Sequence, residues 1–119
     1  MASAALTPEL ALRYLAEFST DVRAAMLLGA DGSVAASDPD DPEAREALRD
    51  GLAMLIEAAD LRPGTDPVAE IEVMMPAGSL FVVRRGGWVL AAVAGRYALS
   101  SLMRYDLNRV LGDLAEGGS

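Results

Sequence analysis

The 119-residue chain contains no cysteine and no histidine. The missing cysteine excludes disulfides, thiol nucleophiles and thiolate metal ligands. The missing histidine removes the commonest general base and the commonest zinc ligand. Lysine is absent too, so all 10 basic residues are arginine and the lysine of a nucleotide-binding P-loop is excluded. We therefore expect no catalytic residues, no metal, no cofactor and no enzyme activity in the chain alone.

Long apolar runs are also missing. No run approaches the roughly 20 residues that a membrane span needs. The first residues, 1–6, lack the basic region and apolar core of a secretory signal. A net charge of −8 disfavours nucleic acid and anionic membranes as partners. The expectation is a cytoplasmic protein without membrane insertion.

The residues that are present indicate a folded protein. The chain is 52% hydrophobic and has a length that suits one domain, which we expect over 1–119 with a core at about 7–115. Acidic residues are concentrated in the first part of the chain, because residues 1–75 hold 15 of the 18 acids but only 5 of the 10 arginines. A partner that contacts this part should be basic or neutral.

The patterns predict three helices and five strands. The order is helix, strand, strand, helix, strand, strand, strand, helix, with the helices at about 8–19, 42–60 and 98–115, and the strands at 22–29, 33–37, 68–75, 80–85 and 88–95. The pairs Asp31-Gly32 and Gly86-Gly87 indicate tight hairpin turns. We therefore expect an α/β (α+β) fold with three layers, in which a mainly antiparallel five-stranded sheet carries helices on both faces.

Apolar residues at helical spacing predict the buried faces of the first and the last helix in the sequence. In the first helix these residues are Leu10, Tyr14, Leu15 and Phe18. In the last helix they are Leu99, Leu102, Met103, Val110, Leu111 and Leu114.

The middle helix has more apolar surface than one contact requires. One stripe, which suits the sheet, consists of Ala44, Leu48, Leu52, Leu55 and Ala59. A second stripe lies alongside it and consists of Ala47, Gly51, Met54 and Ala58. Glycine inside a helix costs about 1 kcal/mol relative to alanine, so Gly51 favours close approach of another surface. We interpret the second stripe as a dimer or partner interface; the alternative is close packing of the helix on its own sheet.

Two glutamates mark the strand after this helix. Glu70 and Glu72 share one face of a strand that we expect at the edge of the sheet. Their charge is interpreted either as protection against open-ended pairing or as a solvated face. We include both residues in the predicted interface. Like charges directly opposite one another destabilise a sheet, so an antiparallel self-pair must be staggered.

Three stretches together resemble the roadblock family, also called the dynein-light-chain roadblock domain. They are the hairpin over residues 24–37, the small-residue helix that follows it, and the meander over residues 80–94 with its closing amphipathic helix. The resemblance covers about residues 7–115 and implies a roadblock/profilin-like fold. It also implies a homodimer in which the central helices pack together and the following strands pair. Bacterial family members are typically partners or regulators of small Ras-like GTPases.

The leading interpretation is therefore a homodimeric scaffold that binds a Ras-like GTPase and modulates or couples its activity. The main alternative is a profilin-like or PAS-like domain that holds a small molecule between sheet and helix. A small hydrolase is a weaker alternative, because no histidine or lysine is available to activate a serine.

Two further groups of charged residues have simple interpretations. Arg84 and Arg85 precede a hairpin tip, where an arginine finger for phosphoryl transfer could project, although a solubilising surface pair is the favoured interpretation. The acidic run Asp38, Asp40, Asp41 and Glu43 lacks the spacing of a calcium loop and suits a helix start instead.

Overall fold

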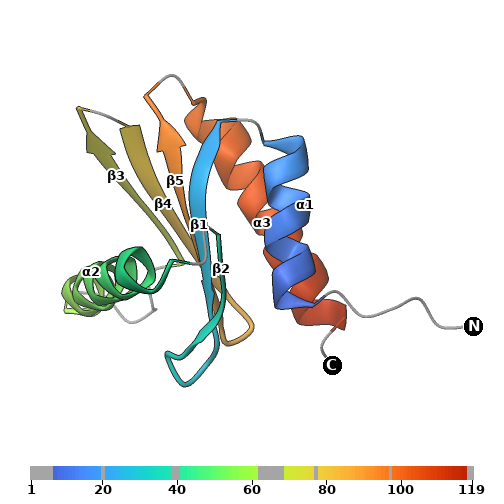
Figure 1. Ribbon diagram of the computed structural model, residues 1–119, viewed down its shortest axis with the longest axis horizontal. Helices are drawn as coiled ribbons and strands as arrows, with labels where there is room; N and C mark the ends of the chain where they lie inside the picture. Colours follow the sequence, from blue (N-terminus) through green and yellow to red (C-terminus); the bar gives the residue numbers. More distant parts are fainter. Residues whose placement is uncertain are drawn as a thin grey trace, which may run out of the picture.

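The computed structural model describes residues 7–19, 21–38, 41–61, 69–76, 78–96 and 98–117. The elements follow the predicted order, and their bounds are α1 Pro8–Phe18, β1 Val22–Leu28, β2 Val34–Asp38, α2 Pro42–Asp60, β3 Glu70–Met75, β4 Gly78–Arg85, β5 Trp88–Gly95 and α3 Ser100–Gly117 (Figure 1).

The five strands form one antiparallel sheet in the order β2-β1-β5-β4-β3. Helix α2 covers one face, while α1 and α3 lie side by side on the other (Figure 1). β3 lies at an edge of the sheet, as predicted. The predicted three-layer α+β fold with mainly antiparallel pairing is confirmed.

The larger of the two cores lies between the sheet and the α1/α3 pair. Alternate strand residues such as Leu27, Phe81 and Leu90 point into it because side chains alternate between the faces of a strand. Helix α3 contributes the buried residues Met103, Leu107, Val110, Leu111 and Leu114.

The predicted buried faces of the two outer helices are partly wrong. In α1 the fully buried residues are Ala11, Leu12 and Leu15, whereas Tyr14 is 41% exposed. In α3 Leu102 is 51% exposed, and Leu99, just before the helix, is 66% exposed. The physical reason is that each helix contacts both the sheet and its neighbouring helix, so its buried face is rotated from the most apolar stripe. The side chain of Phe18 lies outside the described residues.

The smaller core lies between the sheet and α2. Its fully buried members are Met26, Leu28, Leu52, Val82 and Ala91. Of these only Leu52 comes from α2, with Leu48 and Leu55 packed beside it. Helix α2 is thus held on the sheet by one narrow stripe, as the sequence predicted for Leu48, Leu52 and Leu55; the side chain of Ala44 lies outside the described residues.

The hairpin turns depend on glycine. Gly86 and Gly87, between β4 and β5, have φ of 59° and 83°, the left-handed region that a tight two-residue turn requires. Between β1 and β2, Gly32 has φ 82°, and the Asp31 carboxylate accepts hydrogen bonds from the backbone N–H and hydroxyl of Ser33 at 3.0 and 2.6 Å. These bonds lower the pKa of Asp31. Asp31-Gly32 is a turn, as predicted.

Candidate functional site

The second apolar stripe of α2 faces solvent. Ala47, Gly51, Met54 and Ala58 are all exposed, and Met54 is 72% exposed. A Cβ atom added to Gly51 would meet no atom of the described residues within 4 Å, apart from the backbone of its own helix. The alternative that this stripe packs closely on its own sheet is therefore wrong. The stripe is an accessible, small-residue surface.

An ion pair at the C-terminal end of α2 links this helix to the sheet. The guanidinium of Arg84 on β4 donates to both carboxylate oxygens of Asp60, at 2.8 Å from Nη2 and 3.3 Å from Nη1. The hydrogen bond and charge of Arg84 lower the pKa of Asp60. Two parallel bonds of this kind fix direction as well as distance. Arg84 therefore helps to hold the second stripe of α2 away from the sheet.

The neighbouring arginine serves the opposite layer. Arg85 lies against α3, because a Cβ atom at Gly112 would approach its Nη1 to 2.9 Å. Consecutive strand residues point to opposite faces, so Arg84 reaches α2 and Arg85 reaches α3. The interpretation of the two arginines as a surface pair is thus wrong for Arg84, whose side chain is only 17% exposed. Neither contact resembles an arginine finger held away from its own protein.

The two glutamates of β3 point towards α3. Glu72 accepts a hydrogen bond from the hydroxyl of Ser100 at 2.7 Å. Glu70 accepts one from the Asn108 amide at 2.8 Å and lies 3.9 Å from the Arg104 guanidinium. Ser100, Arg104 and Asn108 are spaced four residues apart and so share one side of the helix. The carboxylates are therefore paired with α3 instead of projecting freely from the strand edge.

A groove separates α2 from β3 on the opposite side of the sheet. It has a volume of about 390 Å³ and is lined by Leu55, Ala58, Ala59, Glu70, Ile71, Glu72 and Val73. The structure thus brings together three of the predicted interface residues: Ala58, Glu70 and Glu72. Ala47, Gly51 and Met54 lie further along α2 and do not line this groove.

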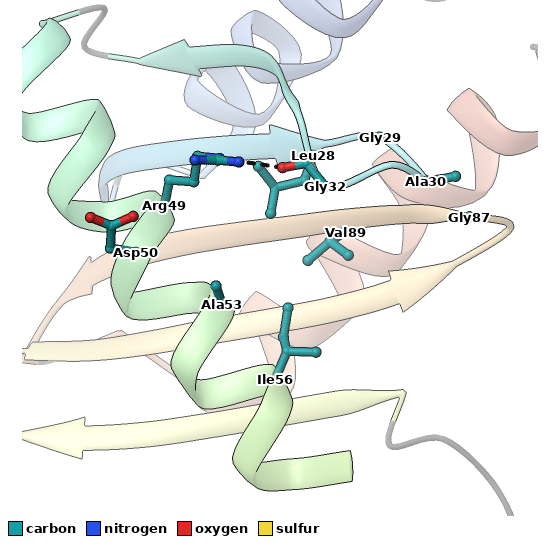
Figure 2. Close-up of a pocket in the computed structure, with 10 residues that line it drawn as sticks. All are labelled: Leu28, Gly29, Ala30, Gly32, Arg49, Asp50, Ala53, Ile56, Gly87 and Val89. Atoms are coloured by element: carbon teal, nitrogen blue, oxygen red, sulfur yellow. Dashed lines mark hydrogen bonds between the residues drawn. The ribbon is translucent and has the colours of Figure 1, made fainter.

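The sequence did not predict a second cleft, at the other end of the α2 face. It has a volume of about 360 Å³ and lies between α2 and the tips of the β1–β2 and β4–β5 hairpins (Figure 2). Its walls include Leu28, Ala53, Ile56 and Val89, and Arg49 crosses one side to donate from Nε to the carbonyl oxygen of Gly32 at 3.4 Å. The available sequence signal was the small residues Gly29, Ala30, Gly32 and Gly87 in the two turns, which leave the space open.

The described residues, 7–19, 21–38, 41–61, 69–76, 78–96 and 98–117, show neither a metal cluster nor a membrane-spanning helix. Within those ranges, no group of three or more acidic side chains is arranged to hold a metal ion. Asp38 and Asp41 flank the start of α2, and Asp40 lies outside the described residues. No helix in the described part of the chain is long and apolar enough to cross a bilayer.

Comparison with known proteins identifies the fold. The sequence matches no family model and no curated protein. Among solved structures, a Roadblock/LC7 domain from Streptomyces avermitilis is similar with a TM-score of 0.77 and 24% identity, over 92% of this chain and 96% of that one. MglB from Myxococcus xanthus has a TM-score of 0.67 and 16% identity, over 87% and 80% of the two chains. The gliding protein MglB from Thermus thermophilus has a TM-score of 0.67 and 20% identity, over 98% and 97%. The chain has the roadblock fold, which confirms the predicted resemblance at the level of structure.

Proposed function

We propose that this chain is a homodimeric scaffold, one domain over 1–119, that binds a small Ras-like GTPase and modulates or couples its activity in the cytoplasm. It has no catalytic activity of its own in this proposal. The observation that carries the proposal is the solvent-facing side of α2, where Gly51 and the 72% exposed Met54 lie open beside the edge strand β3.

Dimerisation would cover the features that are costly to expose. Met54 on α2 and Met74 on β3 are 72% and 80% exposed, and they lie on opposite sides of the sheet beside its β3 edge. An uncovered edge strand presents backbone N–H and C=O groups that another chain can pair with. One partner that packs on α2 and pairs with β3 satisfies both requirements. A second copy offers complementary elements by symmetry.

The cleft at the hairpin tips supplies a separate surface for the GTPase. It lies beside Arg49, Ala53 and Ile56 of α2, whereas the groove at β3 lies beside Leu55, Ala58 and Ala59, so the two sites are lined by different residues of the helix. A dimer formed at β3 therefore leaves this cleft accessible. Helix α2 carries five acidic residues and two arginines, so the proposed partner surface is basic.

Similar proteins support both parts of the proposal. A structure described as MglB with a tetrameric arrangement has a TM-score of 0.67 and 20% identity over 98% of this chain. It supports self-association as a property of this fold. The GTPase as partner comes from the resemblance to the roadblock family, whose bacterial members typically regulate Ras-like GTPases.

The test combines light scattering with co-elution. The full chain is expected to elute as a dimer and to co-elute with a Ras-like GTPase of the same organism in one nucleotide state. Ala53→Arg, which fills the cleft with a charge, should abolish co-elution and leave the dimer intact. Ala16→Arg, on the exposed side of α1, is the matched control and should bind normally. Binding that survives Ala53→Arg would place the GTPase elsewhere, and a monomeric chain would overturn the scaffold proposal.

The same cleft gives specific support to a second function, small-molecule sensing. Its volume of about 360 Å³ falls in the range of ligand pockets, and Arg49 and Asp50 are polar groups at its wall. A ligand held there would raise the unfolding temperature in a saturable way. A thermal-shift screen of metabolites with wild-type and Ala53→Arg proteins separates the two functions, since a ligand in this cleft would stabilise only the wild type.

A further inference from the structure

We infer that the second copy pairs antiparallel with β3 in one particular register, with Val73 directly opposite Val73 of the partner subunit. This inference rests on the proposed homodimer and specifies how its two sheets join. The evidence is the direction of the backbone groups of β3 and the positions of its two glutamates.

The existing pairing of β3 with β4 determines which backbone groups face outwards. Arg84 N–H donates to the carbonyl of Ala69 at 2.8 Å, and these two residues stand opposite one another in the antiparallel ladder. Hydrogen-bonded and non-hydrogen-bonded pairs alternate along such a ladder. Ile71, Val73 and Met75 therefore direct their N–H and C=O groups to β4. Glu70, Glu72 and Met74 direct theirs to the open edge.

Charge then excludes several registers of a symmetric pair. In a symmetric antiparallel pair one residue of β3 faces its own copy, and we name each register by that residue. Residues that face each other lie on the same side of the sheet, so their side chains are close together. Centring on Ile71 places Glu70 opposite the partner's Glu72. Centring on Glu72 or Glu70 places that glutamate opposite itself. Like charges directly opposite destabilise a sheet, so these three registers are unfavourable.

The remaining registers differ in how many backbone donors they satisfy. Centring on Val73 places Glu72 opposite the partner's Met74 and Glu70 opposite the partner's Pro76. The outward N–H groups of Glu70, Glu72 and Met74 then each face a carbonyl oxygen of the partner. Pro76 can serve as the acceptor for Glu70 because proline lacks the backbone N–H but keeps its carbonyl group. Centring on Met74 would instead move Glu70 beyond the end of the partner's strand, which turns at Pro76. The N–H of Glu70 would then lose its acceptor.

The side chains suit the same register. Val73 and Ile71 lie on the α2 side of the sheet and line the groove beside Leu55 and Ala58. Pairing centred on Val73 brings Val73 against its own copy, with Ile71 diagonal to the partner's Val73, and continues the smaller core across the dimer axis. On the other side, Ser100 and Asn108 already hold the two glutamate carboxylates. The exposed Met74 gains cover from the partner's strand.

Single-cysteine cross-linking tests the register, because the native chain has no cysteine. A non-hydrogen-bonded pair brings the two Cα atoms to about 4.5 Å, a separation that a disulfide can span. Val73→Cys should form a covalent dimer under mild oxidation at least roughly tenfold faster than the other variants. Ile71→Cys is the matched control, since it shares the face and ladder position, and Glu72→Cys and Met74→Cys report the adjacent registers.

The outcomes separate the register from the dimer itself. Fastest cross-linking at Ile71, Glu72 or Met74 would show a different register and overturn this inference, while the homodimer stands. A chain that is dimeric by light scattering yet cross-links at none of the four positions would show that β3 is not paired, which also overturns it. A monomeric chain would overturn the proposed function as well. Circular dichroism of each reduced variant checks that it is folded.

Discussion

At the scale of single residues, glycines serve opposite purposes in this chain. Gly87 adopts a left-handed backbone that the β4–β5 turn requires, with φ 83°. Gly51 has an ordinary helical backbone and open space where its Cβ atom would be. Nothing among the described residues of the protomer therefore requires glycine at position 51, where it weakens the helix. The proposed dimer supplies a reason from outside the protomer, and the two positions should respond differently to substitution.

Substitution of Gly51 tests that external requirement. Gly51→Ala should raise the free energy of unfolding of a dissociated protomer by about 1 kcal/mol, because alanine favours helix. Gly51→Leu should leave the fold intact but convert the dimer into a monomer, because the larger side chain prevents close approach of a second helix. Urea unfolding and light scattering measure the two effects. Ala16→Leu, on the exposed face of α1, is the control; a Gly51→Leu protein that remains dimeric would contradict the helix-pair interface.

The Arg84–Asp60 pair predicts a dependence of stability on pH. The pKa of Asp60 is lower in the folded protein than its usual value of 3.8. A carboxyl group with a lowered pKa stabilises the fold above its unfolded pKa, and this contribution is lost as the pH falls through the folded pKa. Arg84→Met should therefore be less stable than wild type near neutral pH, with a difference that shrinks below about pH 4.

Urea unfolding at pH 7 and at pH 3 measures that difference. Asp60→Asn should show the same trend, and the double variant should lose little more than either single variant if the two residues act as a pair. A difference between wild type and Arg84→Met that is unchanged at pH 3 would show that Arg84 stabilises the fold by packing alone.

At the scale of elements, the β4–β5 hairpin depends on its two glycines. An L-residue with a side chain in the left-handed region costs roughly 1–2 kcal/mol. Gly87→Ala should therefore lower the free energy of unfolding by about that amount, and thermal or urea unfolding measures it. Gly87→Asn is the matched control and should cost less, since asparagine tolerates this conformation. Equal losses for the two variants would point to the 3.4 Å approach of the new Cβ atom to Ala30 instead of the backbone.

Secondary structure could be predicted well because its signals are local. The Asp31-Gly32 and Gly86-Gly87 turns and the cap at Thr7 mark where elements end, and α2 begins and ends where its pattern predicted. The buried side of α2, which packs on the sheet, was predicted correctly for Leu48, Leu52 and Leu55, whereas the buried sides of α1 and α3 were predicted only in part. The buried faces of α1 and α3 depend on how these helices pack against each other, as the exposed Tyr14 and Leu102 show.

The sequence could predict which residues belong to the candidate site better than it could predict which side chains they contact. Helical periodicity placed Gly51 and Met54 on one stripe, but it left close packing on the sheet as an alternative, which the exposure of both residues excludes. The bonds from Glu70 and Glu72 to α3 join residues 28 to 38 positions apart and have no local signal. The Arg84–Asp60 pair and the hairpin cleft likewise depend on the packed sheet. Long-range polar contacts were therefore the part that the sequence could not reveal.

At the scale of the whole molecule, the sheet has two different edges. Helix α1 packs on β2, whereas in the described part of the chain β3 is joined to α3 through the side chains of Glu70 and Glu72. Helices α1 and α3 together cover one face of the sheet, but α2 alone covers the other (Figure 1). The open edge and the exposed side of α2 meet at the C-terminal end of that helix, in the groove beside Val73. The β3 edge thus differs from the β2 edge in lying beside an exposed helix side and a groove.

This asymmetry predicts that stability depends on protein concentration. A dimer that dissociates on unfolding gains stability by mass action, so the unfolding temperature should rise over a hundredfold increase in concentration. Met54→Glu places a charge on the exposed side of α2 and should remove that dependence, giving a folded monomer. Leu61→Glu is the matched control, because Leu61 is 80% exposed and lies beyond the C-terminus of α2. Scanning calorimetry at several concentrations measures the effect; an unfolding temperature that is independent of concentration in the wild type would mean that the protomer is stable with its β3 edge uncovered.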